Sequence, residues 1–335
     1  MTATSNPSPN WSESPAPDES VQHEEFSRVI GEIQQRVSRR FGPGRAFHRK
    51  QIAGLKGELV IPGHLPEAAA QGLFASPGSY DVLIRLSNGA IAPAADALPD
   101  IRGFALSIRG VTGAAALGGE TDRQDFLLIN LPSLGFHDSA DFARIVPLAA
   151  SGQTALLTGL IKQRGPISGA LEAARLTKEL SRWFPGFATA TFYSAAPVRW
   201  GDYAGKVRLL PQQHGWDPRA NRDWGADVAR RLAEAPLVFS LQVQLYLDEQ
   251  RTPIEDGLAT WSEQDSPWLT VATLNVPQQD PSDEAGQQLA AEVEAASFDP
   301  WAALAEHRPL GEIMRARKVA YYASQRARGA HDPGA

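Results

Sequence analysis

The stretch "RARKVAYYASQRARG", residues 315–329, combines five basic residues with two adjacent tyrosines close to the end of the chain. A basic last turn is common in helices, because cations stabilise the negative end of the helix dipole. A solvated terminal helix is therefore the simplest interpretation. The spacing adds a second feature, since at about 100° per residue four side chains share one stripe. These are Arg317, Tyr321, Ser324 and Arg328, while Tyr322 points about a quarter-turn away.

On this stripe Arg317 lies one helical turn before Tyr321 and covers its phenol. A cation close to a phenol favours the ionised phenolate. Phenolates are hard anionic ligands, and the iron(III) of haem is one ion that binds them. Taken alone, this pair does not outweigh the interpretation as a solvated terminal helix, because arginine and tyrosine often occur four residues apart in helices.

Composition excludes several functional classes. The chain has 335 residues, enough for one large domain or two ordinary ones, and a net charge of −6, which argues against a nucleic-acid-binding protein. It has no cysteine, so disulfides, thiolate nucleophiles, iron–sulfur clusters and cysteine zinc sites are excluded.

The N-terminal stretch 1–20 is rich in Ser, Pro and Asp and lacks the basic and apolar regions of a signal peptide. We predict a disordered tail over 1–20, a single domain over 21–330 and a short tail over 331–335. No run of 18 apolar residues occurs, so we expect no membrane span, and a cytoplasmic location fits these signals.

Hydrophobic periodicity predicts an α+β fold. Helical spacing covers 26–41, 142–163, 168–184 and 283–296. Short strands bounded by Gly, Pro and Asn-Gly cover 57–63, 80–89, 102–110 and 125–132. The segment 235–250 alternates strictly, and 267–279 resembles its antiparallel partner. Strands and helices do not alternate regularly, so an antiparallel sheet or barrel with helices outside is favoured over a doubly wound sheet.

Three positions break local rules. Arg85 lies in the middle of an apolar strand, where a charge requires a partner such as Asp81 or Asp100, or a bound anion. His48 follows Arg45 by three residues, although a lone histidine is more often a satisfied hydrogen-bonding residue than a catalyst. Asn130 ends an apolar strand shortly before a proline, which is also typical of a turn.

The order of these motifs resembles the haem catalase superfamily, in particular its shortened, peroxidase-like members. The motifs are RxxH at 45–48, RLS at 85–87, DIRGFA at 100–105, NxP at 130–132 and RxxxY with a later arginine at 317–328. Each motif alone is moderately specific. Their occurrence in the family's order, from about residue 41 to 329, makes the combined evidence for the resemblance strong. The resemblance implies a catalase-like antiparallel β-barrel core, surrounding helices and a C-terminal helix that ligates haem.

The resemblance also implies a role for each matched residue. Tyr321 would be the axial ligand of haem b, kept ionised by Arg317. Propionate binding would fall to Arg45, Arg85 and Arg328, with Phe142 stacked on the haem. On the distal side, His48 would move the peroxide proton, Ser87 would hydrogen-bond that histidine, and Asn130 would orient the peroxide.

Several positions depart from the family pattern. The distal asparagine usually lies three residues before the proline, whereas Asn130 lies two before Pro132. Leu134 and Gly135 replace the paired phenylalanines that narrow the access channel. The chain ends soon after the tyrosine helix, so no NADPH is expected.

The sequence therefore predicts a haem peroxidase that uses hydrogen peroxide or organic hydroperoxides with an organic donor, and has weak catalase activity. A fatty-acid hydroperoxide isomerase or lyase of the allene oxide synthase type is the alternative enzyme. A non-catalytic haem-binding protein and a soluble barrel that binds an apolar ligand are the alternatives without turnover. The resemblance is compatible with a homo-oligomer.

Overall fold

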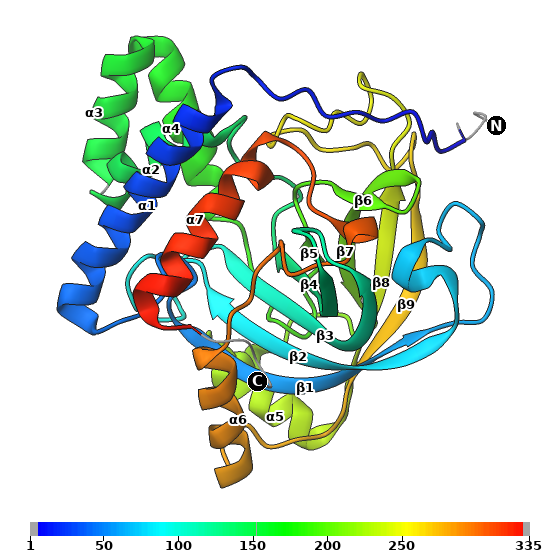
Figure 1. Ribbon diagram of the computed structural model, residues 1–335. Helices are drawn as coiled ribbons and strands as arrows, with labels where there is room; N and C mark the ends of the chain where they lie inside the picture. Colours follow the sequence, from blue (N-terminus) through cyan, green and yellow to red (C-terminus); the bar gives the residue numbers. More distant parts are fainter. Residues whose placement is uncertain (1–5, 152, 331–335) are drawn as a thin grey trace.

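The computed structural model describes residues 6–151 and 153–330 as a β-barrel with helices packed outside it (Figure 1). The strands are β1 (Gln51–Ile61), β2 (Gly78–Asn88), β3 (Arg102–Ala114), β4 (Glu120–Ile129), β5 (Phe192–Tyr193), β6 (Val198–Trp200), β7 (Tyr203–Pro211), β8 (Leu237–Leu245) and β9 (Trp268–Val276). All their pairings are antiparallel, and β5 pairs with both β4 and β7, which closes the barrel. The predicted α+β fold with an antiparallel barrel is confirmed.

Alternation along the strands fills the barrel interior. On β8, the side chains of Phe239, Leu241 and Val243 are fully buried in the barrel core. Strand β9 is the antiparallel partner of β8, as the sequence predicts. Because side chains on a strand alternate between two faces, the intervening Ser240 and Gln242 lie on the outer face of β8.

The helices lie on the outside of this barrel. They are α1 (Glu19–Phe41), α2 (Ser139–Ala150), α3 (Gln153–Arg164), α4 (Pro166–Leu180), α5 (Trp224–Glu234), α6 (Glu284–Ala295) and α7 (Glu312–Arg328). Helices α1 and α7 lie side by side, where Phe26 and Ile30 pack on Ala316 and Ala320 (Figure 1). The single helix predicted over 142–163 is instead two helices, α2 and α3, and the sequence between them contains a Ser-Gly pair, which forms helix poorly.

The N-terminal segment differs from the disordered tail predicted over 1–20. Residues 6–18 form no helix or strand, but the Ser8 N–H and the Trp11 indole N–H donate to backbone carbonyls of the barrel loops. Glu13 pairs with Arg308 and Arg315 at 2.7 and 2.5 Å. The helix α1 then begins at Glu19. Residues 1–5 and the tail predicted over 331–335 lie outside the described residues.

Among the described residues, no helix combines the length and the apolar character needed to cross a lipid bilayer.

A buried histidine makes the stability of this fold depend on pH. His307 is fully buried against Trp200, and its Nε2 accepts a hydrogen bond from the Leu73 N–H at 2.9 Å. Burial lowers the pKa of His307 from 6.5 to about 3. Between these values the unfolded chain binds a proton that the folded chain does not, so the free energy of unfolding falls as the pH falls from 6.5 toward 3.

We expect this histidine alone to cost roughly 2 kcal/mol of stability between pH 7 and pH 5. His307→Gln keeps a hydrogen-bond acceptor but does not titrate. Urea denaturation at both pH values should therefore show a weaker pH dependence for this variant by about that amount. Equal pH dependence in the two proteins would contradict the assignment.

Candidate functional site

A cavity of about 500 Å³ lies between the outer face of β2–β4 and the helices α1, α2 and α7. This volume falls within the range of small-molecule and cofactor sites. Its walls contain eight of the nine predicted site residues: Arg45, His48, Arg85, Ser87, Phe142, Arg317, Tyr321 and Arg328. Most of the remaining wall is apolar, so the polar side chains stand out as a small, defined set.

Helix α7 forms one wall of the cavity. All four residues of the sequence stripe, Arg317, Tyr321, Ser324 and Arg328, line it. The Nη2 of Arg317 donates a hydrogen bond to the Tyr321 hydroxyl at 2.8 Å, and the guanidinium carbon lies 5.0 Å from the ring centroid. Tyr322 is 62% exposed and does not line the cavity.

The residues His48 and Ser87 lie on the barrel side of the cavity. The Ser87 hydroxyl and the His48 Nδ1 are 3.0 Å apart, which leaves Nε2 for a ligand. Gly103, paired with Ser87 across the β2–β3 ladder, permits this contact, because a Cβ there would lie 2.6 Å from the His48 Nδ1. His48 itself has a positive φ of 51°, a conformation that is uncommon for residues other than glycine.

Burial, together with the nearby Arg85, Arg317 and Arg45 guanidiniums, lowers the pKa of His48 to about 3. The imidazole is therefore neutral near pH 7 and can accept a proton from a bound molecule.

Three arginines gather at one end of the cavity around a single carboxylate. The Nη1 of Arg45 and the Nη2 of Arg85 lie 2.6 and 2.8 Å from the two carboxylate oxygens of Glu294. Arg45 and Arg328 each also donate to the backbone carbonyl of Ala296 at 2.8 Å. The partner of Arg85 is thus Glu294, and the sequence-based suggestion of Asp81 or Asp100 is wrong.

Burial lowers the pKa of each of these arginines, to about 10 for Arg328. Three guanidiniums against the one Glu294 carboxylate leave two positive charges in a buried setting. Such an excess favours a ligand that carries two negative charges.

The predicted site residue Asn130 does not line the cavity. Its carboxamide oxygen accepts a hydrogen bond from the Arg102 N–H at 2.7 Å, and it is absent from the cavity wall. Ile129, three residues before Pro132, lines the cavity instead. The wall there is apolar where the family pattern places the asparagine.

Sequence reasoning missed four residues that shape the cavity: Gly103, Ile129, Glu294 and Phe298. Glu294 is separated from Arg85 by 209 residues, and no local pattern connects them. Gly103 lies inside the quoted DIRGFA motif, whose glycine could have indicated a close approach to the backbone. The predicted Phe142 lines the cavity within a cluster of rings from Phe26, Phe47 and Phe136.

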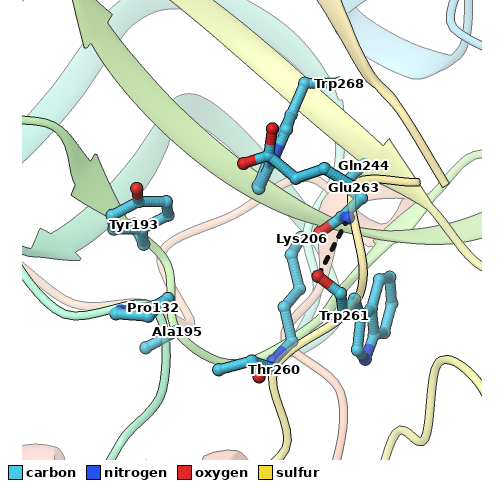
Figure 2. A pocket seen from close by; sticks show the side chains of 9 residues that line it. All are labelled: Pro132, Tyr193, Ala195, Lys206, Gln244, Thr260, Trp261, Glu263 and Trp268. Carbon is cyan, nitrogen blue, oxygen red and sulfur yellow. Dashed lines mark hydrogen bonds between the residues drawn. The ribbon is translucent and has the colours of Figure 1, made fainter. Parts of the chain in front are cut away.

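A second cavity, of about 180 Å³, lies on another part of the barrel, and Figure 2 shows Tyr193 facing Lys206, Trp261 and Trp268 across it. The Lys206 ammonium donates to the Ala259 carbonyl at 2.7 Å, and burial lowers its pKa to about 8. None of the predicted site residues lines this cavity. The larger cavity is therefore the candidate functional site.

Only the comparison with solved structures finds proteins similar to this chain. No protein-family model and no curated protein matches the sequence. Among solved structures, a fungal catalase matches with a TM-score of 0.67 and 16% identity over 86% of this chain and 60% of its own. A bacterial catalase matches with a TM-score of 0.63 and 18% identity over 98% and 64%, and catalase A from Saccharomyces cerevisiae with 0.62 and 14% over 98% and 68%.

The chain has the catalase fold. The likeness extends over almost the whole chain, while the chain spans only 60–68% of the length of these catalases. The resemblance inferred from the sequence is thus confirmed at the level of the fold. In this catalase fold, the large cavity lies where α7 faces β2–β4.

Proposed function

We propose that the protein is a haem-dependent peroxidase that uses hydrogen peroxide or organic hydroperoxides and has weak catalase activity. One observation carries the proposal: the Arg317–Tyr321 pair and the His48–Ser87 pair line the same apolar cavity. The catalase fold supports a haem protein of this general class. The roles of individual residues rest on the geometry described above.

The residues around the cavity fit haem b. The two propionates of haem b match the two positive charges that remain on Arg45, Arg85 and Arg328 after pairing with Glu294. The Tyr321 hydroxyl, which already accepts a hydrogen bond from Arg317, would supply an oxygen ligand to the iron. When bound, haem would supply the iron and the porphyrin that take up the two oxidising equivalents of the peroxide.

The neutral His48 would move the proton. It would accept the proton from one peroxide oxygen and return it to the other, so that this second oxygen leaves as water or an alcohol. Its hydrogen bond to Ser87 fixes the ring and leaves Nε2 for this transfer. No role in orienting the peroxide is proposed for Asn130, because it does not line the cavity.

The cavity wall favours organic donors or hydroperoxides over hydrogen peroxide alone. Leu134 and Gly135 line the cavity, and the Gly135 carbonyl accepts a hydrogen bond from Arg175 at 3.0 Å. Gly135 has no side chain to narrow the passage, and the apolar wall around Ile129 would accommodate an alkyl chain. This apolar wall also supports the alternative function, a fatty-acid hydroperoxide isomerase or lyase that needs no external reductant.

The function can be tested on the haem-reconstituted protein with three assays side by side. These are peroxide-dependent oxidation of a phenolic donor, oxygen release from hydrogen peroxide, and product analysis with a lipid hydroperoxide without donor. We expect donor oxidation to exceed oxygen release. Rearranged lipid products without donor would favour the isomerase, and haem binding without any turnover would favour a carrier.

The Glu294 carboxylate offers an independent test of the propionate site. Glu294→Gln leaves three guanidiniums without a counter-charge, and we expect the haem-free protein to lose roughly 1–3 kcal/mol of stability. This is below the cost at a fully buried pair because the Glu294 side chain is 40% exposed. Haem should reduce the loss, because its propionates replace the missing charge.

Urea denaturation with and without haem measures both effects. Glu292→Gln is the matched control, because Glu292 lies on the same helix and is exposed. Equal stability of the Glu294 variant and the control in the haem-free state would contradict the charge balance.

A further inference from the structure

The α3–α4 hairpin presents a cluster of exposed apolar side chains. Of the thirteen large hydrophobic residues that are exposed in the described chain, five lie between residues 157 and 183. They are Leu157, Ile167, Leu171, Leu180 and Trp183, and of these we call Ile167, Leu171 and Trp183 the hairpin patch. Ile167 and Leu171 are 75% and 67% exposed, so nothing in the described chain covers them. The gathering of such residues in one hairpin indicates an interaction surface.

An exposed tryptophan from another segment extends the patch. The ring of Trp216 lies 5.7 Å from that of Trp183, and both side chains are more than half exposed. Indole rings combine an apolar body with a polar N–H, and they are enriched where a membrane meets water.

The hairpin is basic in an acidic protein. Residues 153–183 contain five basic and two acidic residues, a net charge of +3, whereas the whole chain carries −6. Both acidic residues pair within the hairpin, Glu172 with Arg164 and Glu179 with Arg182. Lys162 and Lys178 have no acidic partner within ion-pair distance in the described chain, and their charges are available to an external anion.

The charges and apolar groups share one face of α4. Ile167, Leu171, Ala174 and Lys178 are spaced at i, i+4, i+7 and i+11, and all four are exposed. A helix with apolar residues beside lysines on its outer face is typical of a segment that lies on a lipid surface.

The exposed stripe and the candidate site lie on different sides of α4. Leu180 is 38% exposed and lines the large cavity, together with Leu176 and Glu179 of the same helix. At 100° per residue, Leu180 lies about 140° around the helix from Ile167. Contact of the stripe with a bilayer would therefore leave the cavity side of α4 free.

We propose that the α3–α4 hairpin docks the protein on anionic lipid bilayers, with the hairpin patch in the interface and Lys162 and Lys178 against the headgroups. The charge of the hairpin favours this occupant over a symmetric second copy, because a two-fold contact would place the same lysines opposite each other. The docking stands on the surface alone.

Sedimentation of the full chain with vesicles, with and without added haem, tests the docking. We expect binding to vesicles of phosphatidylcholine with phosphatidylglycerol, and little binding to phosphatidylcholine alone. The double variant Lys162→Glu/Lys178→Glu should reduce binding at least tenfold, since each lysine near such a surface contributes about 1 kcal/mol. Leu171→Ser should also reduce it, whereas Lys56→Glu, an exposed charge reversal on β1, should not.

Each other outcome overturns the docking proposal. Equal binding to both kinds of vesicle, or no binding to either, removes the role of the lysines. A dimer in light scattering that Leu171→Ser dissociates, without vesicle binding, would assign the patch to a second copy. Because turnover of a water-soluble peroxide is measured without vesicles, failure of the docking and failure of the proposed function are distinguishable.

Discussion

Tyr321→Phe is expected to weaken haem binding by at least tenfold and to remove the absorption features of an oxygen-ligated ferric haem. The variant loses the phenol oxygen that accepts from Arg317 at 2.8 Å and keeps the ring that packs in the cavity. Arg45, Arg85 and Arg328, which we propose as propionate ligands, remain in this variant, so some haem should still bind. Without a strong anionic ligand, however, the ferric state would lose its stabilisation. The transfer of haem to a competing haem-free globin measures the change as a faster release.

The neighbouring tyrosine provides the matched control for this prediction. Tyr322 lies one position along α7, is 62% exposed and does not line the cavity. Tyr322→Phe should therefore release haem at the rate of the unchanged protein. Loss of haem from both variants would indicate a general disturbance of α7, and loss from neither would remove Tyr321 as a ligand.

His48→Ala is expected to slow the reaction with peroxide by about 10² to 10⁴-fold while haem binding is retained. The reason is that no other histidine lines the cavity within the described chain, so the peroxide proton loses its neutral acceptor. Stopped-flow absorbance after mixing with hydrogen peroxide measures this rate. Added imidazole should restore part of it, because the substitution leaves space for a small base.

Two further variants distinguish a loss of proton transfer from a general structural effect of replacing a histidine. Ser87→Ala removes the partner that holds the His48 ring at 3.0 Å, and we expect a smaller loss than for His48→Ala. His137→Ala changes an exposed histidine paired with Asp256 and should leave the rate unchanged. A full rate in His48→Ala would contradict its role as the proton acceptor.

Most of the fold can be predicted from the periodicity of hydrophobic residues in this sequence. The two-residue alternation of β8 places Phe239, Leu241 and Val243 in the barrel core, and the helical spacing of α7 brings Arg317 and Tyr321 into one cavity. Both follow from local geometry, since a strand or a helix fixes which of its own residues share a face. Features of this kind can be predicted from a single chain.

Contacts between distant segments could not be predicted in the same way. Glu294 reaches Arg45 and Arg85 because α6 packs beside β1 and β2, and no local pattern encodes that packing. Its motif assigns Asn130 to the site, but its side chain accepts a hydrogen bond from the Arg102 N–H outside the cavity. A shift of one residue at a strand end is enough to move a side chain to the other face. The Ser-, Pro- and Asp-rich composition near Glu13 predicts disorder, yet its ion pairs with Arg308 and Arg315 depend on tertiary structure.

The central claim is that Tyr321 holds haem iron in the large cavity. The most direct test is the absorption spectrum of the full chain, purified from haem-supplemented cells and then titrated with haem. We expect one haem per chain, with a Soret band and the features of high-spin ferric iron. A colourless protein that takes up no haem on titration would contradict it and would leave Arg45, Arg85 and Arg328 with a purely structural role.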